Sequence, residues 1–128
     1  MKQVGTLLED ERQRLLEASF SVPFVHYKSH DKDYWAYQSG DELWLKICPG
    51  GFVHKHTDKA GVRLQHVVQT NPLAVSYVAG EAFSLTQGGI YELDGRLEHW
   101  SVNNGSEDRI HYIELVKILR TAQPFTRT

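Results

Sequence analysis

Two histidines and an aspartate in this chain have the types and spacing of a metal site. In an extended segment His54, His56 and Asp58 point to one face, because side chains alternate along a strand. His99 begins a later apolar segment and supplies a third candidate ligand. Two imidazoles and one carboxylate on one face of an octahedron form the facial triad of non-haem Fe(II) oxygenases, which leaves positions open for a chelating cosubstrate and O₂. We therefore predict a metal site made of His56, Asp58 and His99.

An arginine follows this pattern. Arg109 stands ten positions after His99, at the start of the last long apolar segment. A guanidinium that points inward there can bind a carboxylate through two parallel hydrogen bonds. A His-x-Asp pair alone arises often by chance, so the combination with a distal histidine and an arginine carries the prediction.

The elements that must position these residues are one helix and a series of strands. Thr6 and Glu9 have the spacing of a capping box, which predicts a helix over about 6–18, before Pro23. Beyond it, short segments rich in β-branched and aromatic residues alternate with Gly, Pro and Asn turn signals. The predicted strands are Phe24–Tyr27, Tyr34–Gln38, Leu43–Cys48, Phe52–His56, Arg63–Thr70, Ala74–Val78, Phe83–Thr86, Ile90–Leu93, His99–Val102 and Arg109–Leu119. Such a series favours a mainly β fold, a double-stranded β-helix (a jelly roll or cupin-like barrel) with one N-terminal α-helix.

Length and composition limit the alternatives. The 128 residues predict a single domain, with a barrel over about 22–119 and a frayed tail at 120–128. Fourteen Lys and Arg against 16 Asp and Glu give a net charge of −2, which excludes the basic footprint of a nucleic-acid or anionic-membrane partner. The single cysteine, Cys48, excludes an intramolecular disulfide. No apolar run reaches about 20 residues and no signal peptide is evident, so we expect a cytoplasmic protein.

Several segments between Gly51 and Glu114 carry a family resemblance. They are His56–Asp58, Arg63–Pro72, Gly88–Asp94, His99–Asn104 and Asp108–His111. This stretch resembles the aspartyl/asparaginyl β-hydroxylase family, whose relatives include proline hydroxylases. The resemblance implies a double-stranded β-helix and an Fe(II)- and 2-oxoglutarate-dependent dioxygenase, a hydroxylase that uses O₂ and releases succinate and CO₂.

The resemblance also implies roles for individual residues. His56, Asp58 and His99 would hold Fe(II) as the catalytic centre, and Arg109 would bind the distal carboxylate of 2-oxoglutarate. Arg63 would lie near a cosubstrate or substrate carboxylate. Ser101 continues the His99 face and is a further candidate for binding the cosubstrate. The expected reaction site is an unactivated C–H bond of a small amino acid, or of an Asp, Asn or Pro in a peptide segment. A homodimer is compatible with the sequence but is not predicted by it.

The sequence departs from the family pattern on one strand. Where family members read Arg-x-His, this chain reads Arg63-Leu64-Gln65, and His66 follows one position later. A shift of one residue moves a side chain to the opposite face of a strand. We therefore expect Gln65 to point inward and His66 outward. His111 shares the strand face of Arg109, with core packing as its default role.

Two other functions remain open. The segment Pro49–His56 resembles the Gly-rich His-x-His approach of cupins, in which His54, His56 and His99 would bind the metal of an isomerase or a 2-oxoglutarate-independent dioxygenase. Against this, no glutamate occurs at positions 59 to 62, and the cupin pattern gives no role to Arg109. The third possibility is a jelly roll that binds a ligand without catalysis.

Overall fold

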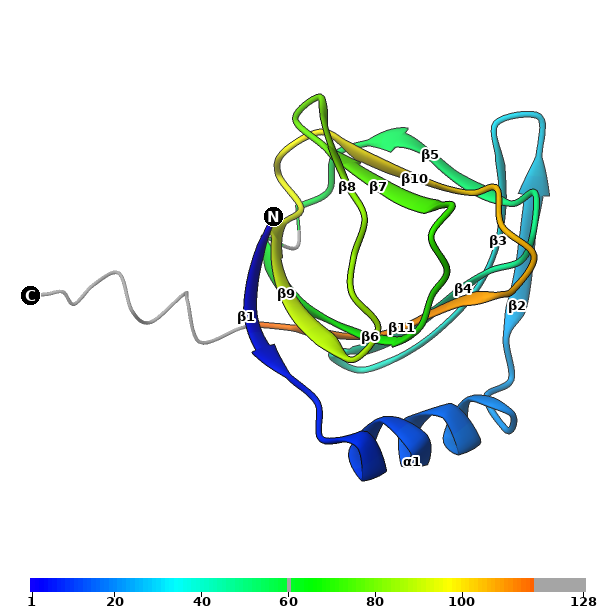
Figure 1. Ribbon diagram of the computed structural model, residues 1–128. Coiled ribbons are helices and arrows are strands. Elements are labelled where there is room, and N and C mark those ends of the chain that lie inside the picture. Colours follow the sequence, from blue (N-terminus) through cyan, green and yellow to red (C-terminus); the bar gives the residue numbers. More distant parts are fainter. Residues whose placement is uncertain (60, 117–128) are drawn as a thin grey trace, which may run out of the picture.

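The computed structural model describes residues 1–59 and 61–116 of the chain. Within them, one antiparallel sheet of 11 strands curls into a barrel, with a single helix outside it (Figure 1). In chain order the elements are β1 (Lys2–Thr6), α1 (Glu9–Ser19), β2 (Val25–Ser29), β3 (Lys32–Ser39), β4 (Glu42–Ile47), β5 (Phe52–His56), β6 (Val62–Gln69), β7 (Ala74–Val78), β8 (Glu81–Phe83), β9 (Gly89–Asp94), β10 (His99–Asn103) and β11 (Arg109–Leu115). The predicted mainly β jelly-roll fold with one helix is confirmed.

The strand order brings distant parts of the sequence together. The sheet runs β1-β9-β6-β11-β4-β3-β5-β10-β7-β8, and β2 pairs with β3 beside this path. Neighbours on this path such as β5 and β10, or β6 and β11, are far apart in the chain. The barrel therefore places the segment around His56 next to the segment around His99, and Arg63 and Arg109 on adjacent strands.

The N-terminal segment differs from the prediction. Residues Lys2–Thr6 form β1, which pairs with β9, so Thr6 lies opposite Gly89 at the end of a strand and does not cap the helix. The helix begins at Glu9 after Leu8, whose backbone N–H donates to Glu11 Oε1 at 2.9 Å. Thr6 does not serve as the N-cap because the backbone through Thr6 pairs with β9, so the helix starts only after Leu8.

The predicted boundaries of one short strand also differ, at β8. The strand covers Glu81–Phe83, two residues earlier than the predicted start at Phe83. The backbone N–H of Thr86 donates instead to the hydroxyl of Tyr91, at 2.9 Å, which takes it out of the sheet ladder. The predicted tail at 120–128, and the end of the last predicted strand beyond residue 116, lie outside the described residues.

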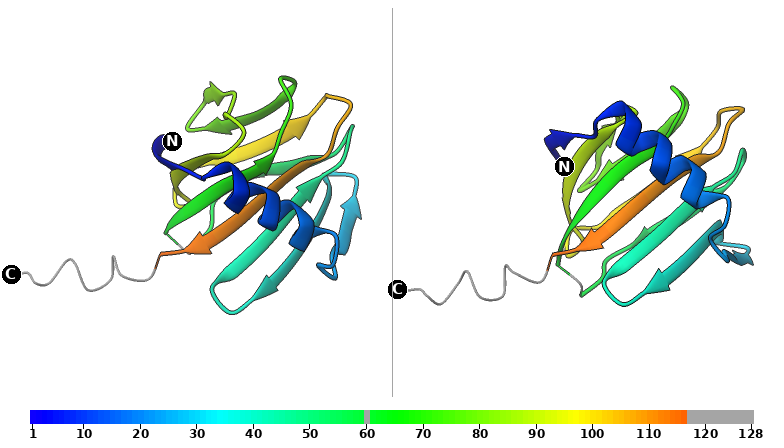
Figure 2. Two further views of the ribbon diagram at one scale, coloured as in Figure 1. Left: turned by 60° about the horizontal axis from the view of Figure 1, so that its bottom comes forward. Right: turned by 90° about the horizontal axis from the view of Figure 1, so that it is seen from below.

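The helix crosses the outer face of the barrel at β6 and β11 (Figure 2). Arg12 attaches it there, because its Nη1 donates to the backbone oxygen of Val68 at 2.8 Å while its Nη2 pairs with Glu9 at 2.9 Å. Inside the barrel, Val67, Leu85 and Tyr91 form an apolar cluster. Among the described residues, no helix has the length and apolar composition that a bilayer span requires.

Candidate metal site and the adjoining cavity

The three predicted metal ligands come together. His99 at the start of β10 lies opposite His56 at the end of β5, and Asp58 follows in the next loop. One potential ligand atom from each side chain lies within 4.8 Å of the others. The backbone of Asp58 is fixed by its N–H, which donates to Gly95 O at 2.9 Å. A Cβ at position 95 would collide with the Asp58 carboxylate, so this approach requires glycine.

Both imidazoles are oriented for metal binding. His56 Nδ1 lies 2.7 Å from the backbone oxygen of His54, and His99 Nδ1 lies 2.7 Å from that of Leu97. A carbonyl oxygen can only accept, so each Nδ1 carries the proton and donates. Each Nε2 then has a free lone pair, and a backbone carbonyl that fixes the tautomer is the usual support of a metal-binding histidine.

The electrostatics of His99 favour its neutral form. Burial lowers the pKa of His99, and the neighbouring His56 and Arg63 lower it further. His99 Nε2 lies 3.6 Å from Asp58 Oδ2, and Arg63 Nη2 donates to the same carboxylate oxygen. Neutral imidazole and carboxylate are the forms that bind metal ions.

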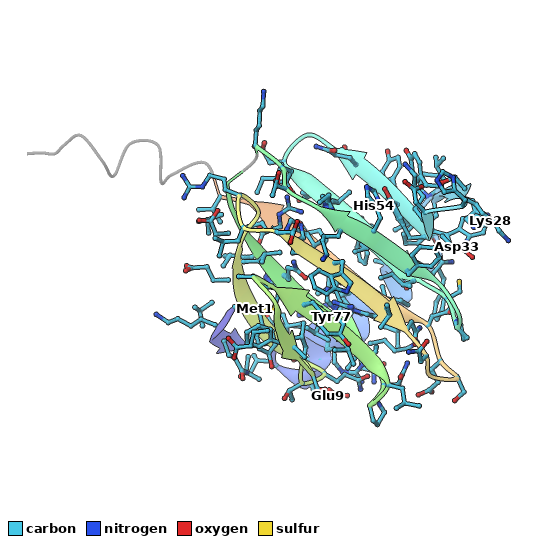
Figure 3. All side chains as sticks on the ribbon, turned by 90° about the horizontal axis from the view of Figure 1, so that it is seen from above. Met1, Glu9, Lys28, Asp33, His54 and Tyr77 are labelled. Carbon is cyan, nitrogen blue, oxygen red and sulfur yellow. The ribbon has the colours of Figure 1, made fainter. Side chains whose placement is uncertain are left out.

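His54 is separated from this group by a bulge in β5. In the pairing of β5 with β10, His56 lies opposite His99 and Val53 lies opposite Ser101. The two pairs are three residues apart on β5 but only two residues apart on β10, so β5 contains one extra residue. The extra residue breaks the alternation of faces, and both Val53 and His56 line the cavity inside the barrel. Within the described residues His54 belongs neither to that lining nor to the metal-binding group, and its buried Nδ1 has no hydrogen-bond partner. Figure 3 shows His54 on the β3 side of this face, toward Asp33.

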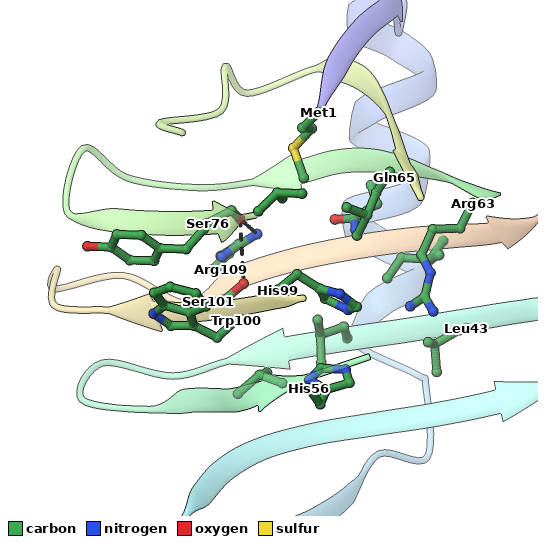
Figure 4. A pocket seen from close by; sticks show the side chains of 16 residues that line it. Met1, Leu43, His56, Arg63, Gln65, Ser76, His99, Trp100, Ser101 and Arg109 are labelled. Atoms are coloured by element: carbon green, nitrogen blue, oxygen red, sulfur yellow. Dashed lines mark hydrogen bonds between the residues drawn. The ribbon is translucent and has the colours of Figure 1, made fainter. Parts of the chain in front are cut away.

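A cavity of about 70 Å³ adjoins the histidines inside the barrel. Its polar lining comes from five strands, since His56 lies on β5, Arg63 and Gln65 on β6, Ser76 on β7, His99 and Ser101 on β10, and Arg109 on β11. Figure 4 shows the imidazoles of His56 and His99 beside one another, with Arg63 on one side and Arg109 on the other. The cavity wall thus contains all the site residues named from the sequence except Asp58, which belongs to the candidate metal group and is close to His99 but does not line the cavity.

Arg109 is a buried cation that has no acidic partner among residues 1–59 and 61–116. Its side chain is 3% exposed; Nη2 donates to Ser76 Oγ at 2.6 Å and Nε to His111 Nε2 at 3.0 Å. Nη1 is buried and has no hydrogen-bond partner among the described residues. Burial lowers the pKa of Arg109 to about 10, which still leaves it charged at neutral pH. A buried charge is costly unless an anion pairs with it, so the cavity is suited to a carboxylate.

Arg63 pairs with one of the candidate metal ligands. Its Nη2 donates to Asp58, whereas its buried Nε has no hydrogen-bond partner among the residues that the structure describes. Ser101 lies in the wall close to Ser76, with 3.5 Å between the two hydroxyl oxygens. Arg63 therefore supports a candidate metal ligand, and its remaining donor is available to a ligand in the cavity.

The expected faces of Gln65 and His66 agree with the structure. Gln65 lines the cavity and its Oε1 accepts from His111 Nδ1 at 2.8 Å. His66 points to the outer face, where its Nδ1 donates to the backbone oxygen of Tyr112 at 3.0 Å and its Nε2 lies 3.3 Å from Glu114 Oε1.

Ser76 and Met1 are residues of the cavity wall that the sequence analysis did not assign to the site. Ser76 had a readable signal, because it lies between Ala74 and Val78 on the buried face of a strand, where a hydroxyl is unusual. Met1 had none, since its place in the wall depends on β1 joining the sheet.

Comparisons with known proteins define the fold. No family model matches the sequence, and no curated protein matches it either. Among solved structures, a predicted oxalate decarboxylase from Thermotoga maritima has a TM-score of 0.57 at 15% identity, over 77% of this chain and 96% of that one. A cupin-like protein from the same organism has a TM-score of 0.57 at 18% identity, over 73% of this chain and 77% of that one. The cupin domain of Schizosaccharomyces pombe Cnp3 has a TM-score of 0.53 at 13% identity, over 82% of this chain and 72% of that one.

The chain has the cupin fold. At these identities the similarity concerns the fold alone, and it does not single out the aspartyl/asparaginyl β-hydroxylase family that the sequence resembles. One of these cupin-fold neighbours, the predicted oxalate decarboxylase, is described as an enzyme. What distinguishes this chain must therefore come from its own residues, which form a cupin barrel with a His-Asp-His group that could hold a metal ion.

Proposed function

We propose that this protein is an Fe(II)- and 2-oxoglutarate-dependent dioxygenase that hydroxylates an unactivated C–H bond. The observation that carries the proposal is the combination, inside one barrel, of the His56–Asp58–His99 group with a buried arginine that has no acidic partner in the part of the chain that the structure describes. The metal-binding group supports a metal centre, and Arg109 supports an acidic cosubstrate. Because the arginine lies in the wall of the same cavity as both histidines, a short dicarboxylic acid could contact both.

The residues fit the implied metal and cosubstrate. His56 and His99 offer Nε2 lone pairs, Asp58 offers a carboxylate oxygen, and this donor set is typical of non-haem Fe(II). Bound iron would supply the coupled oxidation in which 2-oxoglutarate and O₂ become succinate and CO₂ while the substrate C–H becomes C–OH.

The protein contributes binding and orientation to this reaction. Arg109 binds the distal carboxylate through Nη1, which has no partner among the described residues, in a site where burial strengthens the ion pair. Ser101 and Ser76 offer hydroxyls beside that arginine, and Arg63 holds Asp58 in place. In this way the chain would hold the distal carboxylate of the cosubstrate at Arg109, and the 2-oxo acid group of the cosubstrate would be directed to the histidines.

The cavity is small compared with a peptide. The cavity of about 70 Å³ is several times the roughly 10–15 Å³ that one water molecule needs, so it suits part of a small acid. We therefore propose that the substrate reaches the metal from the mouth of the barrel, as an amino acid or as an Asp, Asn or Pro of a peptide segment.

The cupin neighbours support a second candidate, a metal-dependent cupin enzyme that acts on a small carboxylic acid without 2-oxoglutarate. One of these neighbours is described as a predicted oxalate decarboxylase. In such an enzyme Arg109 would bind the carboxylate of the substrate itself. The version of this hypothesis that uses His54 is less favoured, because His54 stands outside the metal-binding group of the described residues.

An anaerobic visible spectrum with Fe(II), before and after addition of 2-oxoglutarate, tests the proposal. We expect a weak band that requires both components, is lost in His99→Ala and persists in the matched control His54→Ala. Iron binding without this band would contradict the 2-oxoglutarate assignment and favour the second candidate. Failure to bind iron or another divalent metal would leave a ligand-binding jelly roll without catalysis.

A further inference from the structure

Four buried side chains form a line of hydrogen bonds from β6 to β7 through the inside of the barrel. Gln65 Oε1 accepts from His111 Nδ1 at 2.8 Å, His111 Nε2 accepts from Arg109 Nε at 3.0 Å, and Arg109 Nη2 donates to Ser76 Oγ at 2.6 Å. All four residues are between 1% and 6% exposed. Figure 4 shows the end of this line, where Arg109 meets Ser76.

Chemistry gives each bond in the line its direction. The Nε–H of an arginine can only donate, so His111 Nε2 must present its lone pair to Arg109. The single ring proton of His111 then sits on Nδ1, where the amide oxygen of Gln65 accepts it. Burial lowers the pKa of His111 well below 6.5, and the charge of Arg109 lowers it further, so the ring is neutral.

Gln65 therefore selects the tautomer that Arg109 needs. If the proton moved to Nε2, two donors, His111 Nε2–H and Arg109 Nε–H, would face each other. An amide is suited to this task because it does not titrate, so its oxygen remains an acceptor at every pH. A carboxylate at position 65 would add a negative charge near Arg109 and compete with an incoming anion.

The line also decides which part of the guanidinium remains for a ligand. Ser76 and His111 engage Nη2 and Nε, so the plane of the guanidinium cannot turn, and Nη1 is left without a partner among the described residues. Preorganised donors contribute more than mobile ones because no ordering cost arises when the ligand binds.

We propose that His111 and Gln65 are positioning residues that hold Arg109 for the distal carboxylate of the cosubstrate. Neither residue needs to touch that carboxylate. This inference rests on the proposed function, because it takes 2-oxoglutarate as the ligand. It adds that the hydrogen-bonded line behind Arg109 makes the site select dicarboxylic over monocarboxylic 2-oxo acids.

A comparison of two ligands separates positioning from general structural damage. The Mn(II)-loaded full chain and its Gln65→Leu and His111→Leu variants are titrated with 2-oxoglutarate and with 2-oxobutanoate, which lacks the distal carboxylate. We expect each variant to bind 2-oxoglutarate about tenfold or more weakly, as for a buried polar group that loses its partner, with unchanged affinities for 2-oxobutanoate and Mn(II). Gln69→Leu is the matched control, since Gln69 lies on the same strand but bonds to the backbone oxygen of Asp108.

The outcomes of this titration are distinct. Equal losses for both ligands, or no loss for either, would overturn the positioning role and leave the proposed function intact. A wild-type chain that binds 2-oxoglutarate no more tightly than 2-oxobutanoate would overturn both, since Arg109 would then have no distal carboxylate to select.

The tautomer of His111 gives a second test that needs no ligand and no folded His111 variant. Two-dimensional ¹H–¹⁵N spectra of the histidine rings in the metal-free wild-type chain should show His111 protonated at Nδ1. In Gln65→Leu we expect a shift toward the Nε2-protonated form. A wild-type His111 protonated at Nε2, or at both nitrogens, would overturn the inference.

Discussion

The cavity lies between the candidate metal group His56–Asp58–His99, called the metal end, and Arg109 with its partners, called the arginine end, and these two ends are built differently. At the metal end, Asp58 comes from a loop, its side chain is partly exposed, and its carboxylate is shared by Arg63 and His99. At the arginine end, Arg109, His111 and Ser76 all come from the interiors or first positions of strands and are buried. The metal end thus depends on a loop, whereas the arginine end is held by the sheet itself.

The difference in charge follows the difference in construction. The metal end contributes the carboxylate of Asp58, and burial lowers the pKa of His99, which favours the neutral imidazole that a metal ion needs. The arginine end carries a cation whose third nitrogen has no partner among the described residues. A metal ion and a carboxylate would compensate the two ends separately, and a metal-chelating acid could compensate both. This complementarity is why the two ends can be tested independently.

Removal of the loop-borne ligand should have the largest effect. We expect Asp58→Ala to abolish turnover and to weaken metal binding by more than the roughly 10–100-fold that loss of a supporting residue costs. Folding should persist because Asp58 lies outside the strands. Metal affinity and succinate production report the result, with Asp10→Ala on the exposed face of α1 as the control. Unchanged metal affinity in Asp58→Ala would show that the loop residue does not hold the metal, and the proposed difference between the two ends would be wrong.

Replacement of the buried arginine should affect the other end alone. We expect Arg109→Met to weaken 2-oxoglutarate binding by about 2–5 kcal/mol, as for the loss of one partner of a buried charge pair, with metal affinity unchanged. The free protein should change little in stability, because removal of a buried charge that has no acidic partner among the described residues offsets the hydrogen bonds that His111 and Ser76 lose. Calorimetric titration and thermal unfolding measure the two effects, and Arg96→Met, at an exposed ion pair, is the control.

If Arg109→Met weakened metal binding as much as 2-oxoglutarate binding, the two ends would not be independent. The arginine would then act on the metal group through the barrel, and the comparison would have to be abandoned.

The metal end was the more predictable of the two from sequence. A His-x-Asp spacing and a distal histidine are local features, and the pairing of His56 with His99 only required that their two segments become neighbours. Alternation failed at His54, because a bulge depends on how β5 pairs with β10 and leaves no local mark in the chain.

The arginine end was only partly predictable. The inward directions of Arg109 and Gln65 follow from strand alternation, but the line through His111 to Ser76 joins β6, β11 and β7 and depends on the closed barrel. The displaced helix cap and β1 have a similar cause, since the pairing of Thr6 with Gly89 overrides a local capping signal. Long-range pairing, rather than local propensity, accounts for each of these differences.

Acidification should affect the two ends unequally. The pKa values of His111 and His99 both lie below the usual 6.5, mainly because of burial, so below pH 6.5 the unfolded chain binds protons that the folded chain does not. The free energy of unfolding must then fall as the pH drops, by up to about 1.4 kcal/mol per pH unit for each such group. His111 is the more deeply buried of the two and should contribute the larger share. Denaturant unfolding of the metal-free chain between pH 6.5 and the lower pKa values should therefore show a flatter pH dependence in His111→Gln than in His99→Ala. The reverse order would mean that the metal end, and not the arginine end, holds the more strongly perturbed histidine.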